Sequence, residues 1–424
     1  MTPFQYQNGR LHCEAVPLEQ IANQIGTPVY IYSQAELLSR AAAYIDAAQA
    51  AATNPLVCYA LKANGNPHII RLLAQAGLGA DVTSGGELFL ALAAGVAPNK
   101  IIFSGVGKRR DEIEMALRAG IRALHVESEM ELGVIGAIAA EMEQVTAVGV
   151  RVNPNIKAET HPYISTGQHE HKFGVPLEQA VALLHQAAAH PWLNPVGLAA
   201  HIGSQIEDVE PFIEAAEFLA KTATQLAATG LNLAYVDVGG GLGIRYADDG
   251  VDSVERIRLW ATAVAQPITT ANFNLVLEPG RSLVAPAGAL LTQVVYTKQQ
   301  GQKQFLITDA GMNDLIRPTL YKAYHAIWPL NQKTGTAVVP VTYDVVGPIC
   351  ESGDFLAKER PLSPTQAGDY VAVMQAGAYG FAMSSNYNGR LRPAEVLVTG
   401  DQFHLIRQRQ TYQHLLDGCN IPPA

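Results

Sequence analysis

Cysteine is scarce in this chain. Its 424 residues include only four cysteines, Cys13, Cys58, Cys350 and Cys419. No two of them are close enough in sequence to form a CxxC redox pair or a zinc knuckle, and four are too few for a disulfide framework in a chain of this length. The sequence therefore predicts no metal site, and it indicates a protein that is kept in a reducing compartment.

Long apolar runs and an excess of basic residues are also missing. Segments such as LGVIGAIAA (132–140) are far shorter than a membrane-spanning helix requires. The formal net charge of −9 provides no electrostatic reason to expect nucleic acid or an anionic membrane as a partner. Residues 1–17 contain no basic stretch leading into an apolar one, so we do not expect a signal peptide. These absences predict a soluble, cytoplasmic protein.

What is present is a regular alternation of short β-rich segments with alanine-rich segments of helical spacing. Segments such as PHIIRLLAQAG and RDEIEMALRAG end near glycine, as helices commonly do. Eight strand–helix units over roughly 250 residues match the size of a TIM-type (β/α)8 barrel. An open, doubly wound α/β sheet rarely has eight such units in unbroken series. The candidate strands are residues 55–62, 79–84, 100–105, 123–128, 147–154, 196–204, 234–241 and 274–280.

The periodicity changes near residue 281. Beyond this point, alternating or β-branched segments such as KQFLITDAG follow one another with turns between them and little helix. The N-terminal segment FQYQNGRLHCEAV has an Asn8-Gly9 hairpin signal, and we expect it to join the same domain. The sequence thus predicts a barrel over residues 29–280 and a second, mostly antiparallel β domain built from residues 1–28 and 281–424.

Lys62 ends the first candidate strand of the barrel, in CYALKAN. A lysine at a strand end is usually a solvated charge. This one follows a buried apolar run, where desolvation lowers the pKa of an ammonium group and frees a nucleophilic amine. In a β/α barrel, function gathers at the C-terminal ends of the strands, so Lys62 is a candidate nucleophile.

A glycine run follows the seventh strand, at residues 239–243. Successive glycines let backbone amides close around an anion, although turns also use glycine freely. Barrels commonly bind phosphate in the loops after strands seven and eight, and the eighth strand ends in Glu278-Pro279-Gly280-Arg281. The two loops together predict a phosphate site.

Histidines occur at two further places of interest. His201 ends the sixth strand and is followed by Gly203 and Ser204. It could be a core histidine bonded to a carbonyl group, or a ring that stacks on a flat cofactor beside the phosphate site. The HEH triplet at residues 169–171 could look like a metal pair, but it has no third ligand at a sensible spacing, so we interpret it as loop polarity.

A lysine nucleophile, a phosphate cradle and a carboxylate at a strand end predict pyridoxal 5'-phosphate as cofactor. In this interpretation Lys62 forms a Schiff base, the glycines hold the phosphate and Glu278 faces the pyridine nitrogen. A carboxylate at that position keeps the nitrogen protonated, which makes the ring a strong electron sink.

With these residues the sequence resembles diaminopimelate decarboxylase, a family of pyridoxal-phosphate enzymes that share the alanine-racemase-type barrel. The resemblance spans both predicted domains, with its motifs in order and at sensible gaps. The matching stretches are YALKAN (59–64), GADVTSGGE (79–87), HIGSQ (201–205), VDVGGGLG (236–243), EPGRSLV (278–284), DAGMNDLIRPTLYKAYH (309–325), GPICESGD (347–354) and GAYGF (377–381).

The resemblance implies specific roles for residues of this chain. Lys62 would be the Schiff-base lysine, and His201 would stack on the cofactor ring. Cys350 would be the proton donor, reaching the site from the second subunit of a homodimer. The further cofactor contacts implied are Ser204, Gly240, Glu278, Pro279, Gly280, Arg281 and Tyr379. The implied substrate contacts are Arg281, Arg317, Tyr321, Glu351 and Tyr379. The implied reaction is loss of CO2 from meso-2,6-diaminopimelate to form L-lysine, the last step of lysine biosynthesis.

The residue chemistry agrees with an amino-acid substrate that is charged at both ends. Arg317 and Tyr321 are four apart, so a helical turn would place them on one face. Two arginines can hold a carboxylate in bidentate fashion, and Glu351 can pair with an ammonium group. A surface salt bridge is the ordinary role of an arginine and contributes little. Cys350 would have to lie within hydrogen-bond reach of the reacting carbon if its thiol donates a proton.

Three alternatives remain open on the residues alone. A related barrel decarboxylase acting on ornithine, arginine or a carboxylated polyamine would use the same Lys62 and Glu278. A racemase of the same fold tends to face the pyridine nitrogen with a basic residue, and Glu278 argues against it. The third alternative is a non-catalytic protein that binds pyridoxal phosphate, which the presence of Cys350 and the full set of substrate candidates makes hard to justify.

Overall fold

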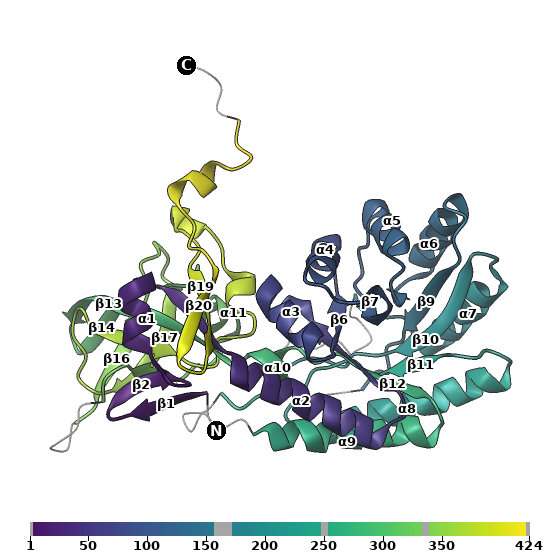
Figure 1. Cartoon of the computed structure of the whole chain (residues 1–424), viewed down its shortest axis with the longest axis horizontal. Helices are drawn as coiled ribbons and strands as arrows, with labels where there is room; N and C mark the ends of the chain where they lie inside the picture. Colours follow the sequence, from purple (N-terminus) through teal and green to yellow (C-terminus); the bar gives the residue numbers. More distant parts are fainter. Residues whose placement is uncertain (1–2, 157–171, 247–252, 333–338, 421–424) are drawn as a thin grey trace. The chain divides into compact units, whose positions relative to one another are not determined.

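The structure, a computed structural model, describes residues 3–156, 172–246, 253–332 and 339–420. The chain divides into two compact units, whose elements are labelled in Figure 1. The sheet unit consists of Met1–Leu37, Arg245–Asp252 and Val284–Ala424, and the barrel unit of Leu38–Ile244 and Ser253–Leu283. The strand β4 (Val29–Ser33) belongs to the sheet unit. The sequence instead suggests that the barrel domain begins at residue 29.

Eight parallel strands close the barrel of the barrel unit, and the last of them pairs with the first. The fold class that the sequence predicts is thereby confirmed. All eight strands end before their predicted segments do. The strands are β5 (Leu56–Ala60), β6 (Gly79–Val82), β7 (Ile101–Phe103), β8 (Ala123–Val126), β9 (Thr146–Arg151), β10 (Leu193–Ala199), β11 (Tyr235–Asp237) and β12 (Asn274–Leu277).

Helices cover the outside of the barrel (Figure 1). Their starts follow from local capping, because Asn66, Ser84 and Ser128 each accept a backbone N–H of the helix that they precede. The helices described are α2 (Gln34–Ala51), α3 (Pro67–Gln75), α4 (Gly85–Ala93), α5 (Arg110–Ala119), α6 (Glu129–Glu141), α7 (Leu177–Ala189), α8 (Glu210–Ala228), α9 (Val254–Thr270) and the short α10 (Arg281–Val284). None of the helices in the described ranges is long and apolar enough to cross a membrane.

The N-terminal segment of the sheet unit forms the predicted hairpin. Strand β1 (Phe4–Gln7) pairs with β2 (Arg10–Cys13) around Asn8 and Gly9, both of which have positive φ angles. β2 also pairs with β3 (Val16–Pro17), and α1 (Leu18–Ile25) follows. Phe4, Leu11 and Ile21 are buried in one core cluster together with residues of the large sheet, so this small sheet packs on the large one.

The large sheet of the sheet unit has nine strands, most of them antiparallel. Two pairs are parallel, β4 with β19 and β14 with β16, so the sheet is mixed in detail. The long β13 (Gly288–Gln300) pairs with β4 and β18 in its first half and with β14 in its second. The remaining strands are β14 (Lys303–Thr308), β15 (Ile327–Pro329), β16 (Val341–Val346), β17 (Phe355–Leu362), β18 (Tyr370–Val373), β19 (Ala394–Thr399) and β20 (Gln402–Arg407). The helix α11 (Arg317–Tyr321) lies between β14 and β15 in sequence.

Candidate functional site

Lys62 lies in a 3-10 turn directly after β5, at the C-terminal end of the barrel strands. Its Nζ atom forms an ion pair with Oδ2 of Asp81 at 2.9 Å. The lysine side chain is 36% exposed, whereas the Asp81 side chain is fully buried in β6. The amine that the sequence predicts to be desolvated is therefore accessible from the mouth of the barrel and is held there by a buried carboxylate. Sequence reasoning missed Asp81, although an acid inside the short buried strand GADV is an unusual pattern.

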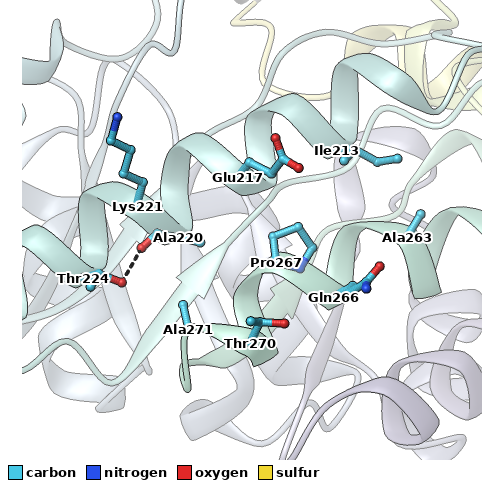
Figure 2. A pocket seen from close by; sticks show the side chains of 10 residues that line it. All are labelled: Ile213, Glu217, Ala220, Lys221, Thr224, Ala263, Gln266, Pro267, Thr270 and Ala271. Carbon is cyan, nitrogen blue, oxygen red and sulfur yellow. Dashed lines mark hydrogen bonds between the residues drawn. The ribbon is translucent and has the colours of Figure 1, made fainter.

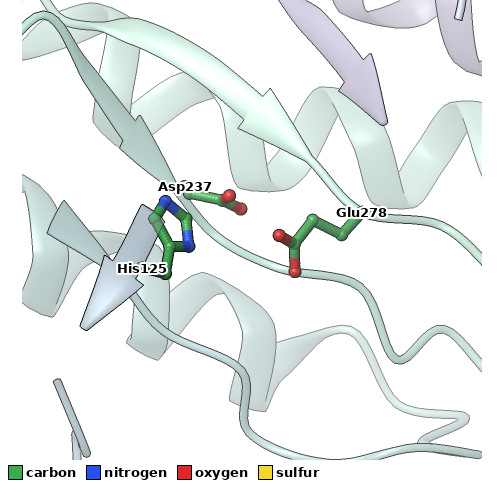
Figure 3. Close-up of side chains that lie close together, drawn as sticks. All are labelled: His125, Asp237 and Glu278. Carbon is green, nitrogen blue, oxygen red and sulfur yellow. The ribbon is translucent and has the colours of Figure 1, made fainter. Parts of the chain in front are cut away.

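Glu278 follows β12 and is buried beside a second acid, Asp237, which ends β11. An oxygen atom of each carboxyl group lies within 4.8 Å of one from the other, and each acid has a buried oxygen to which no described residue donates. Figure 3 shows both carboxyl groups pointing toward one another next to His125 of β8, with ligand atoms of all three within 4.8 Å. Burial raises the pKa of Asp237 to about 7 and, together with the negative charges of Asp237 and Asp81, raises that of Glu278 well above its usual value.

His125 is held in place by two neutral groups. Its Nε2 lies 2.9 Å from the hydroxyl oxygen of Tyr235, and its Nδ1 lies 3.4 Å from Oγ of Ser104. Burial lowers the pKa of His125 to about 3, so the ring is neutral at pH 7. Three such ligand types could also suit a metal ion. Here the Nε2 atom of His125 is engaged by Tyr235, and Oδ1 of Asp237 accepts the N–H of Gly239 at 2.8 Å, so the arrangement is that of two neighbouring buried acids beside a neutral histidine.

The glycine run after β11 packs directly on neighbouring backbone. A Cβ atom on Gly240 would lie 2.0 Å from the carbonyl oxygen of Glu278, and one on Gly241 would lie 2.3 Å from that of Gly203. Gly239 and Gly241 also have φ angles of +70° and +111°. Only glycine allows the loops after β10, β11 and β12 to meet this closely.

The remaining cofactor candidates lie in the same region of the barrel unit. Nδ1 of His201 accepts the N–H of Gly240 at 3.2 Å, and burial lowers the pKa of His201 well below its usual value, so this ring is neutral as well. Nη2 of Arg281 donates to Oγ of Ser204 at 3.0 Å, and the carbonyl group of Pro279 accepts the N–H of Ala60 at 3.0 Å. The predicted set is thus joined by hydrogen bonds across β5, β10, β11 and β12.

These residues fit pyridoxal phosphate. The accessible amine of Lys62 lies in the same ring of strand ends as the buried carboxyl group of Glu278. No described residue donates an N–H to the Oε1 atom of that carboxyl group. The glycine run supplies backbone too closely packed for any side chain. A ring nitrogen could satisfy the buried Glu278 oxygen, and the glycine loop could accept a phosphate group.

Arg317 and Tyr321 are the first and last residues of α11 in the sheet unit, so the predicted helical turn is confirmed. Arg317 is buried, and its Nη1 atom donates to Nε2 of His325 at 2.8 Å. Since Nε2 accepts, Nδ1 of His325 carries the proton and donates to the carbonyl oxygen of Met374 at 2.8 Å. The guanidinium group also lies 4.7 Å from the centre of the Tyr246 ring. The plane of this guanidinium is therefore held by its surroundings.

Cys350 and Glu351 are both exposed, in the loop between β16 and β17. The loop is anchored by Asp354, whose carboxylate accepts the N–H groups of Ile349 at 2.7 Å and of Met312 at 2.6 Å. A neighbouring bond joins the loop to α11, because Oγ1 of Thr319 donates to the carbonyl group of Gly353 at 2.5 Å. Sequence reasoning did not identify Asp354, which holds the backbone beside two predicted site residues.

Tyr379 is half-buried in the sheet unit and has a φ angle of +56°. The following residue, Gly380, leaves no room for a side chain, because a Cβ atom there would lie 2.5 Å from the carbonyl oxygen of Ala376 and 2.7 Å from the Tyr30 hydroxyl. The turn that presents Tyr379 is therefore set by close packing. The HEH triplet at 169–171, by contrast, lies outside the described residues.

A shallow hollow of about 610 Å³ lies on the outer surface of the barrel unit, between α8 and α9 (Figure 2). Its lining is made of small, apolar and polar side chains, and its charged lining residues are Glu217 and Lys221, one helical turn apart. None of the predicted site residues lines this hollow, so it is separate from the site at the strand ends.

Comparison with known proteins identifies the family. The family model for the pyridoxal binding domain of pyridoxal-dependent decarboxylases matches residues 35–285. The chain is 46% identical to diaminopimelate decarboxylase of Pseudomonas aeruginosa over the whole of both proteins. It is 44% identical to that of Aquifex aeolicus, covering 98% of this chain and 96% of the relative.

Solved structures agree with the sequence relatives. The crystal structure of diaminopimelate decarboxylase from Helicobacter pylori complexed with L-lysine has a TM-score of 0.89 and 41% identity, over 94% of this chain and 98% of that one. The enzyme from M. jannaschi has a TM-score of 0.93 and 37% identity, over 99% and 98%. The predicted resemblance, the pyridoxal cofactor and the decarboxylase class are confirmed. The chain belongs to the pyridoxal-dependent decarboxylases and, within them, to the diaminopimelate decarboxylase family.

Proposed function

We propose that this protein removes CO2 from meso-2,6-diaminopimelate and releases L-lysine, using pyridoxal 5'-phosphate held by the barrel unit. The observation that carries the proposal is the accessible Lys62 amine beside buried Asp81, in the same ring of strand ends as buried Glu278. The choice of substrate is supported by full-length relatives that are named diaminopimelate decarboxylases. A solved relative that holds L-lysine, the expected product, supports it further.

In this proposal Lys62 would hold the cofactor through its side-chain amine, and Glu278 would face the ring nitrogen. The neutral ring of His201, fixed by Gly240, stacks on the cofactor ring. When bound, the cofactor supplies the electron sink for the carbon that loses its carboxylate. The phosphate and the rest of the cofactor would be held by Ser204, Gly240, Pro279, Gly280, Arg281 and Tyr379.

The substrate-binding residues proposed in the sheet unit suit an amino acid charged at its remote end. Arg317 has its guanidinium plane held by His325 and Tyr246, and a fixed planar guanidinium is suited to bidentate binding of a carboxylate. The exposed Glu351 would pair with the substrate ammonium group. Arg281, Tyr321 and Tyr379 would complete the contacts. Ornithine carries only an amine at its remote end, so a buried arginine favours diaminopimelate over it.

Cys350 is the proposed proton donor. Its side chain is exposed in a loop whose backbone is fixed by Asp354 and by Asn388, which accepts the N–H of Cys350 at 2.7 Å. An exposed thiol on an anchored loop can reach a reacting group on another chain. We therefore propose that the enzyme is a homodimer in which Cys350 of one subunit serves the site of the other. We also propose a cytoplasmic location, in keeping with the four free cysteines.

The test compares CO2 release from meso-diaminopimelate, ornithine and arginine by the purified protein loaded with pyridoxal phosphate. We expect a clear preference for meso-diaminopimelate. The Arg317→Ala variant should lose that preference, whereas Arg258→Ala, which removes an exposed arginine of α9, should keep it. A clear preference of the unmodified protein for ornithine or arginine would contradict the proposal.

A further inference from the structure

Among the described residues, the buried acids at the mouth of the barrel are more numerous than the cations that form ion pairs with them. Asp81 and Asp237 are fully buried and Glu278 is 8% exposed. Lys62 forms its ion pair with Asp81, and Arg151 of β9 pairs with Glu127 at 3.2 Å. An unpaired buried carboxylate is costly, and such a group commonly takes up a proton instead.

The position of that proton follows from the contact between Asp237 and Glu278. Oxygen atoms of the two side chains lie within 4.8 Å of each other, and two carboxyl groups buried this close together do not both stay ionised without a cation between them, so one of them takes up a proton. The buried atoms Oδ2 of Asp237 and Oε1 of Glu278 have no donor among the described residues. His125, the third member of the cluster in Figure 3, is neutral and is held by Tyr235, so it does not supply the charge that would release the proton.

We propose that Asp237 is a positioning residue for Glu278: the two acids hold one proton between them, which fixes the Glu278 carboxyl group and supplies a proton where the ring nitrogen of the cofactor binds. The inference rests on the proposed cofactor role of Glu278. On binding, the proton would move from the Glu278 carboxyl group to the ring nitrogen, leaving a carboxylate opposite a pyridinium. No other bond would form or break in this step.

The position of the Asp237 carboxyl group is fixed by a backbone hydrogen bond. Its Oδ1 atom accepts the N–H of Gly239 at 2.8 Å, which ties the carboxyl group to the start of the glycine run. The Asp237 carboxyl group points toward that of Glu278 (Figure 3). The charged and titratable groups around the pair are Cys58 on β5, Lys62 after it, Asp81 on β6, Arg122 before β8, His125 on β8, Arg151 on β9 and Tyr235 on β11.

Proton uptake on cofactor binding tests the proposal directly. Calorimetric titration of the cofactor-free protein with pyridoxal phosphate, in two buffers of different ionisation enthalpy, counts the protons taken from solution. Asp237→Asn keeps an oxygen for the Gly239 N–H but cannot share a proton as an acid. We expect the variant to take up more protons than the unmodified protein, up to about one per site, because Glu278 holds its proton less firmly before the cofactor binds when the negative charge of Asp237 is gone. A purely structural role for Asp237 would leave the proton count unchanged. Equal counts for the variant and the unmodified protein would therefore overturn the proposal.

The cofactor-free protein provides a second readout. A shared proton held by the native pair and not by the unfolded chain makes stability fall as pH rises from about 4 toward 7. Asp237→Asn and Glu278→Gln should each flatten this fall, and the double variant should flatten it no further, because one proton is involved. Additive effects would overturn the proposal. If the unmodified protein binds no pyridoxal phosphate, the proposed function fails, yet this pair of variants still decides whether the proton is shared.

Discussion

Replacing Gly240 by alanine adds one methyl group at the point where two loops of the barrel unit meet. Its Cβ atom would lie 2.0 Å from the carbonyl oxygen of Glu278 and 2.9 Å from the carbonyl carbon. A carbon and an oxygen normally come no closer than about 3.3 Å, so one backbone must move by more than an ångström. Overpacking of this kind costs about 1–3 kcal/mol, and the movement would displace the residue proposed to face the ring nitrogen.

The same chemical change at Gly133 provides the matched control. Gly133 is exposed in the middle of α6, and a Cβ atom there would meet nothing within 4 Å. Alanine is favoured over glycine inside a helix by about 0.5–1 kcal/mol, so Gly133→Ala should raise stability. The two substitutions should therefore shift the melting temperature of the cofactor-free protein in opposite directions.

The assay is thermal unfolding of the cofactor-free protein, followed by titration with pyridoxal phosphate monitored by absorbance. Gly240→Ala should melt several degrees lower because of the overpacking, and it should bind the cofactor more weakly because the two loops proposed to hold the cofactor are displaced. Gly133→Ala should bind the cofactor as the unmodified protein does. A Gly240→Ala protein with unchanged stability and unchanged cofactor affinity would refute the packing role of the glycine run.

Four further changes have defined outcomes. Lys62→Ala should abolish the absorbance band of the covalently held cofactor, and retention of that band would rule out Lys62 as the attachment point. Cys350→Ala should keep the band and lose most turnover, so unchanged turnover in steady-state assays would exclude its acid role. Arg317→Ala should raise KM about ten- to a hundredfold with a smaller effect on kcat. This result is expected if Arg317 binds the remote carboxylate of the substrate equally well in the ground state and in the transition state. Burial raises the pKa of Asp314 to about 7, so the stability of the fold should fall as pH rises from about 4 toward 7 and this acid ionises. Asp314→Asn should reduce the loss of stability between pH 5 and pH 8, measured by melting curves at both pH values. An unchanged loss of stability would contradict the raised pKa.

Local sequence patterns were sufficient for many of the elements and for part of the site. The spacing of apolar residues and the glycine and proline stops predict the barrel strands and several of their helices, because both signals act within a few neighbouring residues. Lys62, Glu278 and the glycine run could be identified because each follows a recognisable strand. The Asn8-Gly9 pair likewise indicates its hairpin through the φ angles that those two residues tolerate.

Other features depend on partners that are distant in sequence. β4 pairs with β13 and β19, and the parallel pairing of β14 with β16 is set by the sheet as a whole. The segment of β17 (Phe355–Leu362) has no clear alternation of apolar residues, and its pairing with β16 makes it a strand. Pattern reasoning reports which residues favour a strand, but the neighbour of each strand is decided by packing across the whole unit.

The chemistry of the barrel mouth likewise depends partly on local sequence and partly on tertiary structure. The sequence by itself determined that an amine, a glycine cradle and a carboxylate follow strands of one barrel. Pairing of neighbouring strands then brought Asp81 to Lys62 and Asp237 to Glu278, and closure of the barrel brought His125 of β8 close to the second pair. Whether a buried acid is ionised or protonated depends on the burial and charges that surround it, so only the tertiary structure decided that Asp237 and Glu278 are neighbouring buried acids with raised pKa values.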